Sequence, residues 1–239
     1  MKSCAFTGHR PQNLPFGFRE DDECCTALKE TLKKQIISLI TDENVTHFIS
    51  GMALGVDMYA AEIVLELKKT YPGITLESAI PCETQAAKWN AAMRERYYGI
   101  AAQCDKETLL QTHYTPDCMD KRNRYMVDHA DYIIAVWDGK PSGTGKTVMY
   151  AQSKGKVIIK VNPATLTVER LYMPKNASAN QSLLKSQKSF LKYKRSTLFR
   201  DCGIRVLRSF FCAAFHGSRR SHSVSESRIV PPMNSALSQ

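Results

Sequence analysis

The sequence predicts an α/β fold in which helices cover both faces of a mostly parallel sheet. Short apolar runs alternate with longer segments whose apolar residues recur every three or four positions, up to about residue 172. The connections between these segments are short, as in βα units. Glycines also follow three of the predicted strands, at the carboxyl ends where such sheets bind ligands. We therefore expect one domain over 1–172 and an irregular basic C-terminal extension over 173–239.

The first half of the chain supplies three strand–helix units. Each strand is a short apolar run closed by glycine or proline, and the first helix has an apolar face that contains Leu28, Leu32 and Ile36. Acidic residues at 21–23 favour the positive start of that helix. In order, the predicted elements are a strand at 2–7, a helix over 22–42, a strand at 45–49, a helix that starts at 56 and ends near 71–73, a strand at 74–80 and a helix over 84–102.

The second half continues the same alternation. Its clearest strand is the run Tyr-Ile-Ile-Ala-Val-Trp at 132–137, and Gly155 is a suitable end for the helix that follows. The predicted elements are a weak strand at 106–111, a helix over 119–130, the strand at 132–137, a helix over 146–154 and a sixth strand at 156–161.

Polar residues follow the first predicted strand directly. Gly8 permits close approach of a ligand to the backbone, and His9 and Arg10 carry groups that bind anions. We expect these three residues to contribute to a ligand site, and a plain surface loop is the alternative.

A glycine-bearing turn links the second strand to its helix. Ser50, Gly51, Met52 and Gly55 form this turn, which brings free backbone N–H groups and the positive helix end to one place suited to phosphate. Asp57 lies in the first helical turn, where it either caps the free N–H groups or binds a ribose hydroxyl.

The loop after the fifth strand resembles a Walker A sequence at its end, where Gly145, Lys146 and Thr147 match. The first glycine position holds Lys140 instead, and no later strand ends in an Asp that would help to hold magnesium. We therefore expect Gly143, Thr144 and Gly145 to form an anion-binding turn that needs no metal, rather than a P-loop.

Three motifs in this order resemble those of the YpsA-like family of the SLOG superfamily, which is named for the SMF/DprA DNA-processing proteins and the LOG phosphoribohydrolases. They are Thr7-Gly8-His9-Arg10, the stretch 50–57 and Gly143-Thr144-Gly145. The resemblance spans about residues 1–172. It implies a Rossmann-like fold that binds a nucleotide or an ADP-ribose-like ligand at the glycine motifs, with no assigned reaction and no required cofactor.

The same resemblance raises two further hypotheses. One is LOG-like N-glycosidic cleavage of nucleoside monophosphates, although Thr147 stands where LOG-type hydrolases carry a glutamate. The other is DprA-like binding of single-stranded DNA, which uses basic and aromatic groups, whereas residues 1–164 carry no net charge. The resemblance also suggests that the helix with Arg122, Asn123 and Asp128 borders the pocket, and a solvated helix face is the alternative.

The extension differs from the rest of the chain in charge. Residues 165–239 contain 13 Lys and Arg against 3 Asp and Glu, so they account for the whole net charge of +10. Nucleic acid or an anionic membrane surface is the expected partner of this segment, and a segment without function, produced by readthrough or a frameshift, is the alternative.

The remaining features indicate a cytoplasmic protein. No apolar run reaches the roughly 18 residues of a membrane span, and the N-terminus lacks the apolar stretch of a signal peptide. The eight cysteines form no C-x-x-C pair, so we expect reduced thiols and no zinc site. A homo-oligomer is compatible with the sequence.

Overall fold

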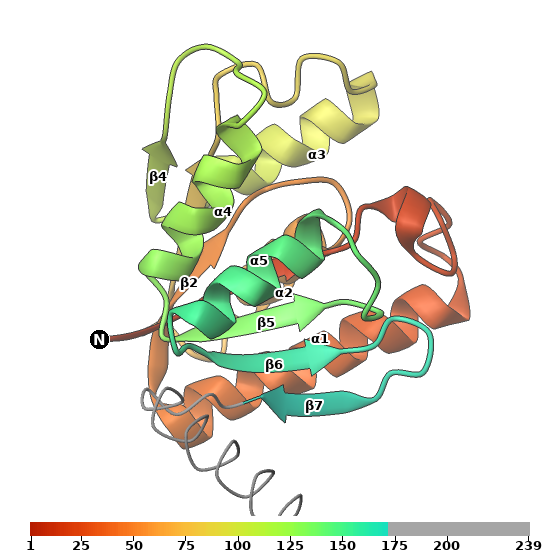
Figure 1. The fold of residues 1–239 in the computed structure, drawn as a ribbon, viewed down its shortest axis with the longest axis vertical. Helices are drawn as coiled ribbons and strands as arrows, with labels where there is room; N and C mark the ends of the chain where they lie inside the picture. The colour runs from red at the N-terminus through yellow and green to blue at the C-terminus, as the bar shows by residue number, and fades with distance from the viewer. Residues whose placement is uncertain (172–239) are drawn as a thin grey trace, which may run out of the picture. The chain divides into compact units, whose positions relative to one another are not determined.

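The computed structural model describes residues 1–171, so the predicted extension at 173–239 lies outside the described residues. Strands and helices alternate along this part of the chain (Figure 1). The strands are β1 (Lys2–Gly8), β2 (Val45–Ser50), β3 (Thr75–Ile80), β4 (Lys106–Leu109), β5 (Tyr132–Val136), β6 (Val157–Val161) and β7 (Val168–Leu171). The helices are α1 (Glu23–Glu43), α2 (Val56–Leu67), α3 (Ala91–Ala101), α4 (Cys118–Asp128) and α5 (Gly143–Ser153), with a 3-10 turn at Pro11–Asn13.

The strands form one sheet in the order β4-β3-β2-β1-β5-β6-β7. All neighbouring pairs are parallel except β6 and β7, which are antiparallel. From β1 the chain moves outward through β2, β3 and β4, and then returns to the other side of β1 with β5. The strand order therefore reverses between β1 and β5, the place where open α/β sheets form a crevice.

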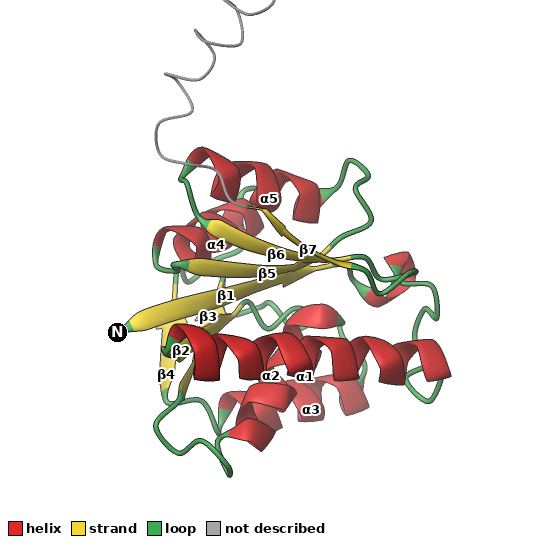
Figure 2. Cartoon of the chain, turned by 90° about the horizontal axis from the view of Figure 1, so that it is seen from below, coloured by secondary structure: helices red, strands yellow, loops and turns green. Residues whose placement is uncertain are grey.

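Helices cover both faces of the sheet, as predicted. Helices α1, α2 and α3 lie on one face, and α4 and α5 lie on the other (Figure 2). Alternate side chains of each strand enter the two apolar cores, because successive residues point to opposite faces. In β1, Phe6 stacks on Phe48 at a centroid distance of 6.0 Å in one core, while Ala5 packs in the other. The predicted Rossmann-like α/β fold is confirmed.

The start of α3 differs from the prediction of a helix over 84–102. Residues 84–89 form turns, and the helix begins only at Ala91. The side chain of Asn90 accepts a hydrogen bond of 2.9 Å from the N–H of Met93 and so caps the helix. The cap therefore sets this boundary, whereas the apolar pattern alone extends further towards the N-terminus.

Two further differences lie near the C-terminal end of the described region. Helix α5 begins at Gly143 rather than 146, because the hydroxyl of Ser142 caps it by accepting the N–H of Gly145 at 3.1 Å. The edge strand β7 was not predicted, since its residues are mostly exposed and carry little apolar signal. None of the helices in residues 1–171 combines the length and the apolar character that crossing a bilayer requires.

A buried carboxylate lies between β2, β3 and β4. The side chain of Glu77 is 2% exposed and accepts hydrogen bonds from four donors. The donors are His47 Nε2 at 2.9 Å, Lys106 Nζ at 3.0 Å, Thr108 Oγ1 at 2.8 Å and the Tyr125 hydroxyl at 2.7 Å. Burial alone would raise the pKa of Glu77, but these donors lower it to about 2. The group therefore joins three strands and α4 as a carboxylate.

Candidate functional site

The three glycine-bearing loops meet at one edge of the sheet. They follow β1, β2 and β5, and β1 pairs with both of the others. Because all three strands are parallel, their carboxyl ends point the same way. The backbone N–H of Val56, at the start of α2, also donates to the carbonyl of His9 at 3.5 Å. The strand order thus brings together segments that are more than 130 positions apart in the chain.

Three cavities in residues 1–171, with volumes of about 320, 370 and 470 Å³, are in the size range of small-molecule sites. The largest of these, about 470 Å³, opens where the strand order reverses between β1 and β5, and we call it the switch pocket. It lies beside the N-cap of α5. Its lining consists of His9, Gln12, Asn13, Leu14, Pro15, Asp138, Lys140, Pro141, Ser142, Pro163 and Ala164.

A hydrogen-bonded pair forms one wall of the switch pocket. The Nε2 atom of His9 lies 3.1 Å from Oδ1 of Asp138, and the backbone N–H of Lys140 donates to the same oxygen at 3.1 Å. The backbone N–H of Lys140, together with His9, lowers the pKa of the Asp138 carboxyl, so this group is ionised. The side chain of His9 is 5% exposed, while that of Asp138 is 26% exposed. The pocket therefore presents a fixed carboxylate.

Asp138 was not among the predicted site residues, although a signal for it exists. It lies two residues after the end of β5, and His9 lies one residue after the end of β1. The residues at 12–15 and at 163–164 carry no comparable signal, because only the folded loops bring them to the pocket.

The predicted anion-binding turn forms the first turn of α5. Gly143 and Thr144 have backbone N–H groups with no partner inside the helix, since they occupy its first positions. A Cβ atom at Gly143 would meet nothing within 4 Å, so this part of the backbone is open. Lys146 is exposed, and the hydroxyl of Thr147 donates to the Gly143 carbonyl at 3.1 Å. Thr147 is therefore engaged with its own helix.

The other predicted glycines serve contacts within the protein. A Cβ atom at Gly8 would lie 2.4 Å from Cβ of Val56, so Gly8 lets α2 pack against β1. Gly55 has a φ of +92°, and a Cβ atom there would lie 2.8 Å from the carbonyl oxygen of His9. These two glycines bring the loops after β1 and β2 into contact.

The turn after β2 is buried and hydrogen-bonded. The hydroxyl of Ser50 donates to the carbonyl of Asp57 at 2.8 Å and accepts the N–H of Met52 at 3.1 Å. Met52 has a φ of 55°, which is strained for a residue with a side chain, and its carbonyl accepts from Gln85 Nε2 at 2.8 Å. Ser50 and Met52 thus stabilise the loop.

Asp57 and Arg122 form a buried ion pair beneath this turn. Arg122 Nη1 lies 3.5 Å from Asp57 Oδ2, with 5% and 7% of the two side chains exposed, and it also donates to the carbonyl of Gly51. Burial raises the pKa of Asp57, an effect that Arg122 partly offsets. The N-cap position of α2 is Gly55, and the backbone N–H of Ala53, just before the helix, counteracts the effect of burial on the pKa of Asp57. Capping and ribose binding by Asp57 both stay predictions. A solvated face is wrong for Arg122, because α4 packs this side chain against the sheet.

Arg10 completes the polar groups at this edge. Its side chain is exposed, and the ion pairs of residues 1–171 do not include it. Burial lowers the pKa of Arg122, and the positive charge of Arg10 adds to this effect. The same charge opposes the burial that raises the pKa of Asp57. Within the described residues no cluster of three or more His, Cys, Asp or Glu side chains is arranged for a metal ion.

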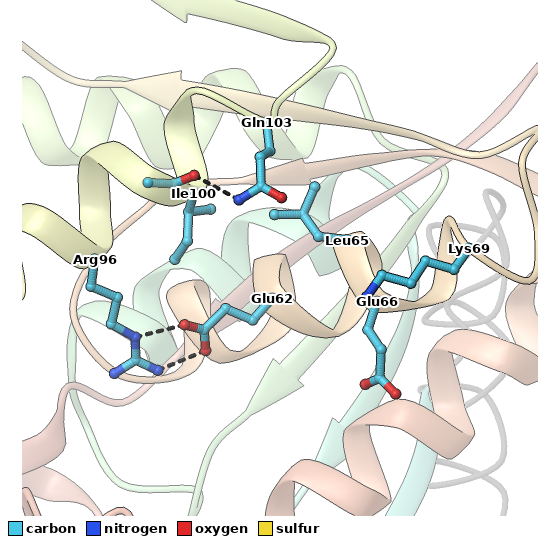
Figure 3. A pocket seen from close by; sticks show the side chains of 8 residues that line it. Glu62, Leu65, Glu66, Lys69, Arg96, Ile100 and Gln103 are labelled. Atoms are coloured by element: carbon cyan, nitrogen blue, oxygen red, sulfur yellow. Dashed lines mark hydrogen bonds and ion pairs between the residues drawn. The ribbon is translucent and has the colours of Figure 1, made fainter.

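Two other cavities are weaker candidates. One, of about 370 Å³, lies between α2 and α3, where Arg96 donates to Glu62 from Nε and Nη2 at 2.6 Å each (Figure 3). The Nη1 atom of Arg96 donates to Glu20, also at 2.6 Å, so this guanidinium group is fully engaged by two carboxylates. The other, of about 320 Å³, lies between α4 and α5 and includes the exposed Met149. Neither lies where the strand order reverses.

Comparison with known proteins places these features in a family context. The sequence model of the YspA SLOG family matches residues 4–170. The UPF0398 protein of Bacillus pumilus (strain SAFR-032) is 33% identical over 148 residues, which cover 61% of this chain and 78% of that protein. The UPF0398 protein YpsA of Bacillus subtilis (strain 168) is 27% identical over 156 residues, covering 64% of this chain and 86% of that protein.

Two solved structures are similar in fold. DNA processing protein A (DprA) from Streptococcus pneumoniae has a TM-score of 0.48 at 19% identity, covering 70% of this chain and 52% of that one. The single-stranded-DNA-binding DprA from Helicobacter pylori has a TM-score of 0.47 at 17% identity, covering 82% and 81%. The family match itself spans the described strands and helices almost completely.

Proposed function

The chain belongs to the YspA SLOG family, and we propose that it binds a small nucleotide or nucleotide-derived ligand in the switch pocket. The phosphate of this ligand meets the backbone N–H groups of Gly143 and Thr144 at the start of α5. The rest of the ligand occupies the cavity between the ends of β1 and β5. Binding requires no metal ion, because the helix start supplies the positive potential.

The position of the switch pocket carries this proposal. Ligands of open α/β sheets bind outside the carboxyl ends of the strands, where the strand order reverses, and the pocket lies at that point. Its volume of about 470 Å³ falls within the range of small-molecule sites. Open space at Gly143 lets a ligand approach the backbone there.

The two other hypotheses depend on the superfamily resemblance alone. For cleavage of a glycosidic bond, the chain lacks the glutamate of LOG-type hydrolases, since Thr147 stands at that position. The Thr147 hydroxyl donates a hydrogen bond within its own helix. DprA-like binding of single-stranded DNA would concern residues 1–172, whereas binding of nucleic acid through the basic extension is suggested by charge and concerns residues outside the described region. Both therefore stay predictions, to be tested by release of free base and by binding of single-stranded DNA.

Thermal-shift and calorimetric titration of the full chain with AMP, ADP, ADP-ribose and NAD tests the proposal. A nucleotide at 100 times its Kd adds about 2.7 kcal/mol to the free energy of unfolding. The variant Gly143→Val keeps ordinary backbone angles and meets open space, so it should fold and yet block the approach of phosphate. We expect it to weaken binding at least tenfold.

Gly99→Val is the matched control. Gly99 is also a helical glycine whose Cβ would meet nothing within 4 Å, but it lies in α3 beside the cavity of Figure 3. It makes the same glycine-to-valine change in helix propensity and should keep nucleotide binding. If well-folded wild-type protein bound none of the four nucleotides, the proposed function would be wrong.

A further inference from the structure

We propose that Asp138 recognises the ribose of the bound nucleotide, with its Oδ2 atom accepting a hydrogen bond from a ribose hydroxyl group. The site then takes ribonucleotides in preference to 2′-deoxyribonucleotides. This inference rests on the proposed function and adds to it the chemical class of the sugar and the residue that selects it.

The two oxygens of Asp138 have different surroundings. Oδ1 is held by His9 Nε2 and by the backbone N–H of Lys140, each at 3.1 Å. Oδ2 has only the Nζ atom of Lys140 at 3.4 Å, and that lysine side chain is 82% exposed. An exposed ion pair of this kind contributes little and is easily exchanged. Oδ2 is therefore the oxygen that is available to a ligand in the pocket.

The position of the carboxylate is fixed by two adjacent strands. His9 follows β1, is buried, and has a backbone carbonyl that accepts the N–H of Val56. Asp138 follows β5, the strand that pairs with β1 up to Gly8 and Val136. An acceptor held in this way loses little conformational entropy when it binds a donor, so its hydrogen bond selects effectively.

The charge of Asp138 decides which part of a nucleotide it contacts. An ionised carboxylate repels phosphate and accepts hydrogen bonds only, so its partner is an uncharged donor. A nucleotide offers such donors in the hydroxyl groups of ribose, in the exocyclic amine of some bases and in the ring N–H of others. Ribose is favoured because its neighbouring 2′ and 3′ hydroxyl groups provide two donors in one place, as in dinucleotide sites that use a carboxylate for ribose.

Matched nucleotide pairs test the inference on the full chain. Calorimetric titration with AMP and 2′-deoxy-AMP measures selection by the sugar, and titration with AMP and IMP measures selection by the base amine. We expect wild type to bind AMP roughly tenfold or more tightly than 2′-deoxy-AMP, as a hydrogen bond to a charged acceptor implies. Asp138→Ala should bring this ratio close to one.

The control variant is Asp117→Ala, which removes an exposed carboxylate paired with Lys121 outside the pocket. It should keep the preference for AMP. Equal affinity for AMP and 2′-deoxy-AMP in wild type, a preference retained in Asp138→Ala, or Asp138-dependent discrimination between AMP and IMP alone would overturn the ribose assignment while leaving nucleotide binding intact. Absence of binding by every nucleotide would overturn the proposed function as well.

Discussion

Replacing one partner of the Asp57–Arg122 pair should destabilise the protein strongly. Both side chains are almost fully buried, with 5% of Arg122 and 7% of Asp57 exposed. Arg122 also binds the Gly51 carbonyl, so the pair connects α4 to the turn after β2. The informative variants are Asp57→Asn and Arg122→Met, which keep approximate size and remove one charge each.

The expected magnitude follows from the geometry. At 3.5 Å, with an effective dielectric constant of about 20, Coulomb's law gives an attraction of about 5 kcal/mol. Desolvation of both groups offsets much of this attraction in the intact pair. Removing one partner leaves the other charge buried and unpaired, so each single variant should lose about 3–5 kcal/mol. That corresponds to a fall in Tm of roughly 6–20 °C for a chain of this size.

Urea denaturation of both single variants and the double variant measures the effect. The double variant should lose less than the two single losses together, because it leaves no unpaired charge. The control pair is Asp120–Arg124, an exposed pair on α4 at 2.7 Å, whose Arg124→Met variant should lose less than about 1 kcal/mol. A loss below about 1 kcal/mol in both Asp57→Asn and Arg122→Met would refute this account of the buried pair.

Three further predictions concern other residues. Lys146 is exposed, so Lys146→Ala should weaken nucleotide binding by about 1 kcal/mol at most. Adding EDTA should not change the affinity of the wild type. Magnesium-dependent binding that is lost in Lys146→Ala would instead indicate a P-loop. Burial opposes ionisation of Glu77, but its hydrogen bonds, first among them the one from His47, lower its pKa from 4.5 to about 2. The ionised Glu77 therefore stabilises the folded protein fully above pH 4.5, and this stabilisation is lost as the pH falls towards 2. Urea midpoints from pH 6 to pH 2 should therefore fall more in wild type than in Glu77→Gln, and parallel curves would contradict this. Gly8→Ala places a methyl group 2.4 Å from Cβ of Val56 and should cost about 1–3 kcal/mol. An unchanged Tm would contradict the close packing.

Local sequence patterns were sufficient for most of the fold. Helix α2 begins at Val56 as predicted but ends at Leu67, a few residues before its predicted end near 71–73, and the strands β1, β2, β3, β5 and β6 lie within one or two residues of their predicted ranges. These patterns are local, because a strand or helix shows its buried face in the residues that form it. Where a side-chain cap sets the boundary, as Asn90 and Ser142 do, the apolar pattern alone places the helix start several residues away.

The sequence by itself determined which loops follow strand ends and which residues stand in them, including His9 and Gly143. Only the tertiary structure decided what each residue does there. Arg122 is 71 positions from Gly51, and their contact exists because α4 packs over β1 and β3, the strands on either side of β2, which ends at Ser50. The His9–Asp138 pair exists because β5 returns to the side of β1, a strand order that no local pattern specifies. Contacts between distant segments depend on how whole elements pack, and this is why the buried pair and the switch pocket appear only in the folded chain.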